Sequence, residues 1–128
     1  MPSADIIRQT IDTYFGAISR LDPDAWAATF AEDGVSLDPY GSPPMRGRAV
    51  LREFLQGLCA AFDQVEMTPD EVFVSGDGAA VKWSLTGVGK AGQAVRFDGI
   101  DTFDIGEDGL IREARGYWDP AVMMGQLQ

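Results

Sequence analysis

Apolar side chains recur with a helical period near the start of the chain. Between residues 3 and 20 they are spaced four, three and four residues apart, at Ile7, Ile11, Tyr14 and Ile18. This spacing places them on one face of a helix. Ser3 stands just before the run, and serine is a favoured helix N-cap. We therefore predict a helix over residues 3–20.

A second, shorter helix is predicted over residues 21–33. It carries Asp22, a capping residue, and Pro23, which fits the first turn of a helix. A short strand is expected to follow over residues 34–39 and to end at Pro39. A loop then leads to the next helical segment.

A third helix is predicted over residues 47–62. Its apolar positions include Val50, Phe54 and Leu58, which are four residues apart and share one face. The same stretch contains the only cysteine, Cys59, which we interpret as a small core residue and not as a nucleophile. This third helix completes the helical half of the chain.

The pattern then changes from a helical to an alternating period, which is typical of strands. Glycine-rich turns, "GDG" and "GEDG", separate the alternating segments and indicate hairpins. Four strands are predicted, over residues 65–76, 78–90, 93–106 and 109–120. The last eight residues, "AVMMGQLQ", show no clear pattern.

Three helices followed by a strand meander predict an α+β fold. We expect a strongly curved, mostly antiparallel sheet to wrap the helices and to enclose an apolar cavity. The 128 residues suit a single domain spanning residues 1–128, with no linker or repeat.

One acid interrupts this pattern, in the segment "VRFDGIDTFDI" of residues 95–105. Strand alternation places Asp101 on the same face as Val95, Phe97 and Phe103. On that face an ionised carboxylate would be costly, so Asp101 is expected to stay protonated and to donate a hydrogen bond. The alternative is a bulge near Gly99 that turns Asp101 toward water. The strand alone favours neither interpretation.

Two further residues are candidates for chemistry. Tyr14 lies on the apolar stripe of the first helix, so it is either plain core or a phenol that points into the cavity. Asp38 precedes Pro39, so it either starts a turn or serves as a general base at the mouth of the cavity.

Large aromatic residues could line the cavity, although each is often ordinary core. Trp118 shares a strand face with small residues, and Phe54 and Trp83 are further candidates for binding an apolar substrate. Arg112 falls on the Trp118 face by alternation, which leaves open whether it enters the cavity or lies at its rim.

The composition excludes several classes of function. The net charge of −10 argues against nucleic acid or an anionic membrane as partner. The chain has no histidine, which excludes Ser–His–Asp and Cys–His catalysis and most transition-metal sites. No nucleotide-binding motif is present, so we expect neither cofactor nor metal. We also find no signal peptide or membrane span and expect a cytoplasmic protein.

Taken together, two blocks resemble the ketosteroid isomerases (steroid Δ5-isomerases) of the NTF2-like, SnoaL-like superfamily: "ATFAEDGVSLDPYGS" and "FDGIDTF". The resemblance covers nearly the whole chain and implies a cone-shaped α+β fold. It implies that Asp38 moves a proton from C4 to C6, while Tyr14 and protonated Asp101 donate hydrogen bonds to the steroid oxygen. It further implies that Phe54 and Trp118 border the steroid slot and that the protein is a homodimer. Such a Tyr and neutral-acid pair is a known pattern in this family.

One position departs from the family. A tyrosine usually follows the Glu–Phe of the third helix and hydrogen-bonds the first tyrosine, but Leu55 stands here. The departure implies a less well positioned Tyr14 and a lower activity or a different substrate.

Three alternatives are consistent with the same fold or cavity. A limonene-type epoxide hydrolase needs an Asp–Arg–Asp set, so Arg112 or Arg96 would have to enter the pocket between the acids. Strand alternation turns Arg96 away from Asp101, which argues against this alternative. A polyketide cyclase commonly uses a histidine, which is absent here. A carrier of steroids or lipids would keep the cavity and need no ionised acid. Phe73 and Ile100, on the outward strand face, give a weak indication of a dimer surface.

Overall fold

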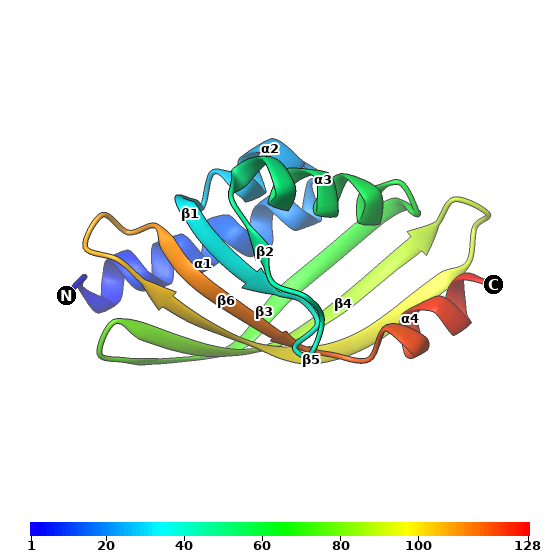
Figure 1. Ribbon diagram of the computed structural model, residues 1–128. Helices are drawn as coiled ribbons and strands as arrows, with labels where there is room; N and C mark the ends of the chain where they lie inside the picture. The colour runs from blue at the N-terminus through cyan, green and yellow to red at the C-terminus, as the bar shows by residue number, and fades with distance from the viewer.

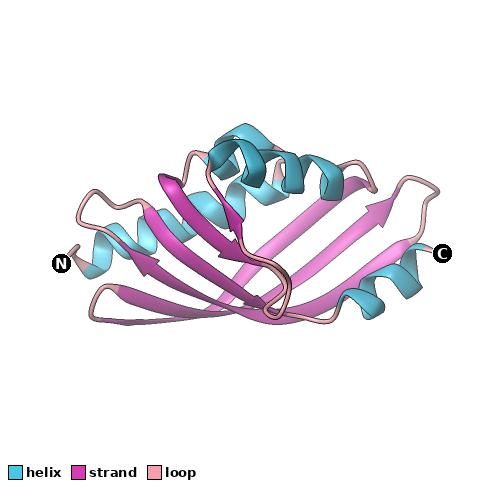
Figure 2. Ribbon diagram, viewed as in Figure 1, coloured by secondary structure: helices cyan, strands magenta, loops and turns pink.

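A long, strongly curved and unclosed sheet forms the base of the structure, a computed structural model that describes residues 1–128 (Figures 1 and 2). The elements follow one another in this order: α1 (Ala4–Ser19), α2 (Pro23–Ala27), β1 (Phe30–Leu37), β2 (Met45–Arg46), α3 (Arg48–Cys59), β3 (Phe62–Ser75), β4 (Gly78–Gly89), β5 (Ala94–Ile105), β6 (Ile111–Tyr117) and α4 (Pro120–Leu127). The predicted α+β class with a curved sheet is confirmed.

The strands are ordered β2-β1-β6-β5-β4-β3, and all neighbours are antiparallel except β1 and β6. Figure 1 shows α1, α2 and α3 on the concave side of the sheet. Helix α4 lies alongside β5, near the C-terminus of the chain. The space between the helices and the concave face therefore has an apolar wall on both sides. No helix is both long and apolar enough to cross a membrane.

The first helix forms as predicted. The Ser3 side chain accepts a hydrogen bond from the Ile6 N–H at 3.2 Å and caps the helix. The predicted face is buried throughout, at Ile7, Ile11, Tyr14 and Ile18.

The second helix is shorter than predicted, because it ends at Ala27 and strand β1 begins at Phe30. Five residues form too short a helix to be stable alone. Pairing with β6 supplies hydrogen bonds instead, beginning with the Ile111 N–H to the Thr29 carbonyl at 2.9 Å. The predicted strand over residues 34–39 is therefore only the second half of β1 and ends at Leu37.

The third helix is confirmed, but its buried face is displaced by one residue. Leu51 and Leu55 are fully buried, whereas Val50 is 47% exposed. Phe54 and Leu58 are half-buried at the edge of that face. The choice between these adjacent stripes depends on how α3 docks against α2.

The C-terminal segment, which showed no pattern in the sequence, forms helix α4. The Asp119 side chain accepts the N–H of Ala121 at 2.9 Å, and Pro120 occupies the first turn. Both are start signals that the sequence contained. This helix brings Met123 into the core.

The register of β5 decides where Asp101 points. Val81 pairs with Asp101 and Trp83 with Gly99, in an unbroken ladder between β4 and β5. The alternative of a bulge at Gly99 is therefore wrong, and Asp101 lies on the concave face.

A bulge does occur in the neighbouring strand β6. Asp104 pairs with Glu113 and Ile105 with Ile111, which leaves Arg112 as the extra residue. Because the bulge changes the alternation, Arg112 is exposed and does not share the face of Trp118. The expected parity of Arg112 is wrong for this reason.

Candidate active site

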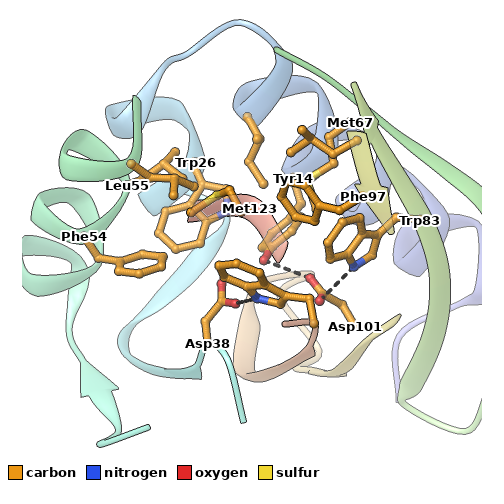
Figure 3. A pocket seen from close by; sticks show the side chains of 14 residues that line it. Tyr14, Trp26, Asp38, Phe54, Leu55, Met67, Trp83, Phe97, Asp101 and Met123 are labelled. Atoms are coloured by element: carbon orange, nitrogen blue, oxygen red, sulfur yellow. Dashed lines mark hydrogen bonds between the residues drawn. The ribbon is translucent and has the colours of Figure 1, made fainter. Parts of the chain in front are cut away.

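A narrow pocket of about 440 Å³, including its opening to solvent, lies between the helices and the concave face of the sheet (Figure 3). All but two of its lining residues are hydrophobic, and those two are aspartates. The lining consists of Tyr14, Ile18, Trp26, Asp38, Phe54, Leu55, Leu58, Met67, Trp83, Leu85, Phe97, Asp101, Trp118 and Met123. The pocket thus joins residues from α1 to α4 around two acids.

Asp101 is hydrogen-bonded at both carboxyl oxygens (Figure 3). The Trp83 indole N–H donates to Oδ1 at 3.0 Å, and the Tyr14 hydroxyl lies 3.2 Å from Oδ2, as its donor. Since Oδ1 accepts the indole N–H, a proton on this carboxyl lies on Oδ2, on the side of Tyr14. Trp83 therefore fixes the orientation of a neutral Asp101.

Burial raises the pKa of the Asp101 carboxyl well above its usual range, and the charge of Asp38 raises it further. The hydrogen bonds from Trp83 and Tyr14 act in the opposite direction, because they favour the ionised form. Only 3% of the residue is exposed. Desolvation outweighs the two donors, and the acid is expected to be neutral.

We expect Asp101→Asn to stabilise the protein at neutral pH. Unfolded chains lose the Asp101 proton near the ordinary pKa of about 3.9, whereas the native state holds it to higher pH. The native state binds more protons across this interval, so wild-type stability falls as pH rises through it. The wild type loses about 1.4 kcal/mol of unfolding free energy for each unit by which the native-state pKa of Asp101 is raised. The neutral amide of Asn does not titrate and so avoids this loss. Urea unfolding at pH 4 and pH 7 measures the difference.

The matched control is Asp98→Asn on the same strand. Asp98 is exposed and pairs with Lys82 Nζ at 3.1 Å, so its replacement should change stability little at either pH. Equal pH dependence in wild type and Asp101→Asn would contradict a buried neutral acid.

Asp38 follows the end of β1 and faces Asp101 across the floor of the pocket. The Trp118 indole N–H donates to its Oδ1 at 2.5 Å. Burial raises the pKa of Asp38, and the Trp118 hydrogen bond lowers it. The pKa of Asp101 is raised well above its usual range, partly by the charge of Asp38, so we expect Asp38 to be the acid of this pair that ionises first.

Two glycines make room for these contacts. A Cβ on Gly116 would lie 2.6 Å from Asp38 Oδ1 and 3.0 Å from Asp101 Oδ1. A Cβ on Gly99 would lie 2.6 Å from the Trp83 ring. The close approach of both carboxyls and of the indole therefore depends on the absence of side chains on β5 and β6.

The structure brings the predicted site residues to one pocket. Tyr14, Asp38 and Asp101 point into it, and their roles stay predictions. Its lining also includes the residues predicted for substrate binding, Phe54, Trp83 and Trp118. Trp83 and Trp118 contribute N–H donors as well as apolar surface, which alternation could not indicate.

Sequence reasoning missed two lining residues of interest. Trp26 lies on α2, and the capping pair Asp22 and Pro23 located that helix without showing that its tryptophan reaches the pocket. Met123 belongs to α4, which the start signals at residues 119–120 could have indicated.

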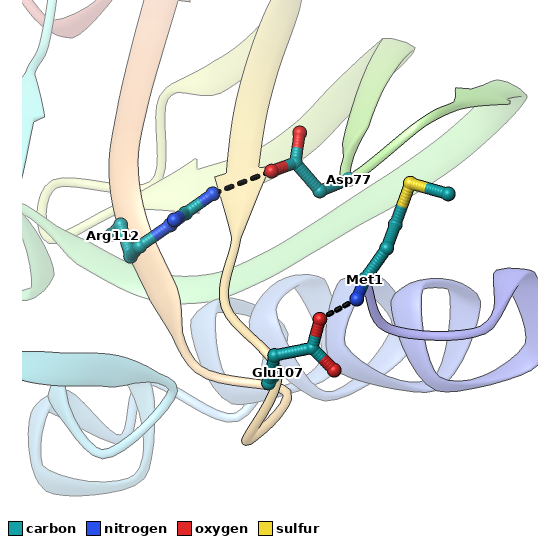
Figure 4. Close-up of polar contacts among 4 residues, drawn as sticks. All are labelled: Met1, Asp77, Glu107 and Arg112. Atoms are coloured by element: carbon teal, nitrogen blue, oxygen red, sulfur yellow. Dashed lines mark hydrogen bonds and ion pairs between the residues drawn. The ribbon is translucent and has the colours of Figure 1, made fainter.

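Arg112 lies outside the pocket. Its guanidinium pairs at 2.7 Å with Oδ2 of Asp77, which lies in the turn between β3 and β4 (Figure 4). The same view shows the amino group of Met1 paired with Glu107, in the turn after β5. An Asp–Arg–Asp set around Asp38 and Asp101 is therefore absent. No group of three His, Cys, Asp or Glu side chains is arranged to hold a metal ion.

Comparisons with known proteins agree with this architecture. The model of the SnoaL-like domain family matches residues 11–114. A steroid Delta-isomerase of Nocardioides simplex is 30% identical over 118 residues, covering 92% of this chain and 94% of that protein. The epoxide hydrolase LasB of Streptomyces lasalocidi is 29% identical over 123 residues, and the match spans only 43% of LasB.

Solved structures show the same fold. The epoxide hydrolase/cyclase-like enzyme SalBIII superposes with a TM-score of 0.82 at 23% identity, covering 93% of this chain and 95% of SalBIII. A protein of Xanthomonas campestris pv. campestris that was suggested to be a polyketide cyclase superposes with a TM-score of 0.83 at 24% identity, covering 97% and 98% of the two chains. At these identities the likeness concerns the fold alone.

Proposed function

Because the chain belongs to the SnoaL-like domain family, we propose that its pocket is an active site and that it isomerises Δ5-3-ketosteroids through a dienolate. The observation that carries this proposal is the pairing of Tyr14 with Asp101 in an apolar pocket, opposite Asp38. A neutral acid beside a phenol presents two donors, and the second carboxylate is free to act as a base.

In the proposed reaction, Asp38 removes a proton from C4 of the steroid. The C–H electron pair forms the C3–C4 double bond, and the carbonyl π electrons move onto the C3 oxygen. Tyr14 and Asp101 donate hydrogen bonds to that oxygen as its charge grows. The C3 carbonyl then re-forms from the oxygen electron pair, and the C3–C4 π pair moves to C4–C5. The C5–C6 π pair takes the proton from Asp38 at C6, which leaves the conjugated enone and an ionised Asp38.

The order of ionisation supports these roles. A base must be ionised and an acid donor must be neutral at the same pH. The pKa of Asp101 is raised well above its usual range, partly by the negative charge of Asp38, so a single proton on Asp101 satisfies both needs. The apolar walls keep water from competing for the substrate oxygen.

The substrate class follows from the walls of the pocket. The rings of Phe97 and Trp118 stack with their centroids 5.7 Å apart. The ring centroids of Phe54 and Trp26 are 6.2 Å apart. Flat apolar surfaces and one polar end suit a small apolar ketone with a rigid ring system. We assign Phe54, Trp83 and Trp118 to substrate binding on this basis.

Turnover of 5-androstene-3,17-dione tests the proposal directly. Formation of the conjugated enone increases absorbance in the ultraviolet, and we expect this increase with purified protein. Binding of the steroid without any enone would instead support a carrier.

A second candidate is the opening of an epoxide or a related cyclisation, as the similarity to LasB suggests. An acid and a base facing each other could protonate an epoxide oxygen while activating a nucleophile. The outward position of Arg112 argues against the limonene type of this chemistry. Consumption of an aliphatic hydroxy-epoxide, with no turnover of the steroid, would favour this candidate.

The exposed side chains of Phe73 and Ile100, on the convex face of the sheet, support a homodimer. Sedimentation equilibrium should give twice the chain mass, and a monomer at all concentrations would contradict this.

A further inference from the structure

The indole N–H of Trp26 is a buried donor without a partner. Trp26 is 0% exposed, and its Nε1 makes no hydrogen bond. Buried polar groups are nearly always paired, so an unpaired one calls for an explanation. Phenylalanine would fill most of this space without leaving a donor unpaired.

The surroundings of Trp26 point to Tyr14. The two rings pack with their centroids 5.7 Å apart, and both side chains line the pocket (Figure 3). The geometry falls short of a hydrogen bond between Nε1 and the phenol oxygen. Burial raises the pKa of Tyr14 well above its usual value, and the indole N–H of Trp26 acts in the opposite direction.

Leu55 makes the contact between Trp26 and Tyr14 significant. At the position of Leu55, ketosteroid isomerases usually carry a tyrosine that donates a hydrogen bond to the tyrosine corresponding to Tyr14. A leucine has no such donor. Leu55 is fully buried and lines the same pocket as Trp26 and Tyr14. The N–H that could serve Tyr14 therefore comes from α2 instead of α3.

We propose that Trp26 is a positioning residue, whose indole N–H donates to the phenol oxygen of Tyr14 when the Tyr14 hydroxyl donates to a substrate oxygen. This inference rests on the proposed function of the site. A phenol that donates its proton to an oxyanion gains negative charge on its own oxygen. A donor aimed at that oxygen strengthens the hydrogen bond to the substrate and holds the ring in place.

The test begins with Trp26→Phe, which removes the N–H. We expect kcat to fall about tenfold with little change in KM, because the lost hydrogen bond is strongest in the transition state. Replacing Trp26 by 3-benzothienylalanine keeps the bicyclic shape and removes only the N–H. It should lower kcat to the same extent, even if Trp26→Phe loosens the packing.

A double-mutant cycle separates positioning from mere packing. In a Tyr14→Phe background the phenol oxygen is gone, so removing the Trp26 N–H should change the rate by no more than about twofold. Equal effects of the benzothienyl substitution in the presence and absence of the Tyr14 hydroxyl would overturn the proposal.

The same cycle can be read without turnover. 2-Naphthol has different fluorescence in its neutral and its ionised (naphtholate) form. The ionised fraction of the bound probe therefore reports how well the pocket stabilises an oxyanion. The benzothienyl variant should bind less of the ionised form than wild type, and only when Tyr14 is present. A protein that passes this test but does not isomerise the steroid keeps the Trp26 inference and loses the proposed reaction. An unchanged ionised fraction overturns the Trp26 inference, whether or not the steroid turns over.

Discussion

Asp38→Asn should abolish most of the isomerase activity, with a loss of about 10²- to 10⁴-fold in kcat. The amide cannot take a proton from carbon, and no second ionised acid lines the pocket. Asn retains an oxygen that can accept the Trp118 N–H, so the local hydrogen bond can persist. Steady-state kinetics with 5-androstene-3,17-dione measure the effect.

The control for this substitution is again Asp98→Asn. Asp98 lies on β5 but is exposed beside Lys82, outside the pocket. It should keep the wild-type rate. An Asp38→Asn enzyme with a rate near that of the control would show that Asp38 is not the base.

Tyr14→Phe should lower kcat by about 10²- to 10³-fold, as expected for the loss of one donor to a developing oxyanion. The ring remains to pack against Phe15 and Phe103, so the fold should be retained. Asp101 would still donate one hydrogen bond, which leaves a residual rate. The matched control is Tyr117→Phe, because Tyr117 is exposed and stacks on Tyr40 away from the pocket.

The pH profile of the Tyr14→Phe enzyme gives a second, independent readout. Activity should rise with pH as Asp38 ionises and fall again as Asp101 loses its proton. The Tyr14 hydroxyl lowers the pKa of Asp101, because it hydrogen-bonds to the ionised form. Removing it raises that pKa, so the alkaline decline should move to higher pH. A decline that moves to lower pH would contradict the neutral-acid assignment.

Much of the fold could be predicted from periodicity, because residues spaced by the period of a helix or a strand lie on one face. The stripe of Ile7, Ile11 and Tyr14 predicted α1, and strand alternation placed Asp101 on the buried face of β5. The same alternation failed at Arg112, because one extra residue in β6 reverses the direction of the side chain. The bulge interrupts the alternation of β6, and its position depends on the pairing of β6 with β5, which the sequence of one strand does not show.

The candidate site divides in the same way. Tyr14 and Asp101 could be chosen from the sequence, because a phenol or an acid on an apolar stripe conflicts with its surroundings. Asp38, at the end of a strand before Pro39, was a weaker candidate, and its role came from the resemblance to the ketosteroid isomerases. The hydrogen-bond donors to the two acids could not be chosen, since Trp83 and Trp118 were expected only as apolar lining of the cavity.

The sequence by itself thus determined the apolar faces on which Tyr14 and Asp101 lie, if the regular period of each element holds. Only the tertiary structure decided which N–H reaches which oxygen. The reason is physical: burial follows from the local period of one element, whereas a hydrogen bond depends on the register and docking of several. The Trp83 contact with Asp101 joins two strands, and the Trp118 contact with Asp38 joins residues 80 positions apart.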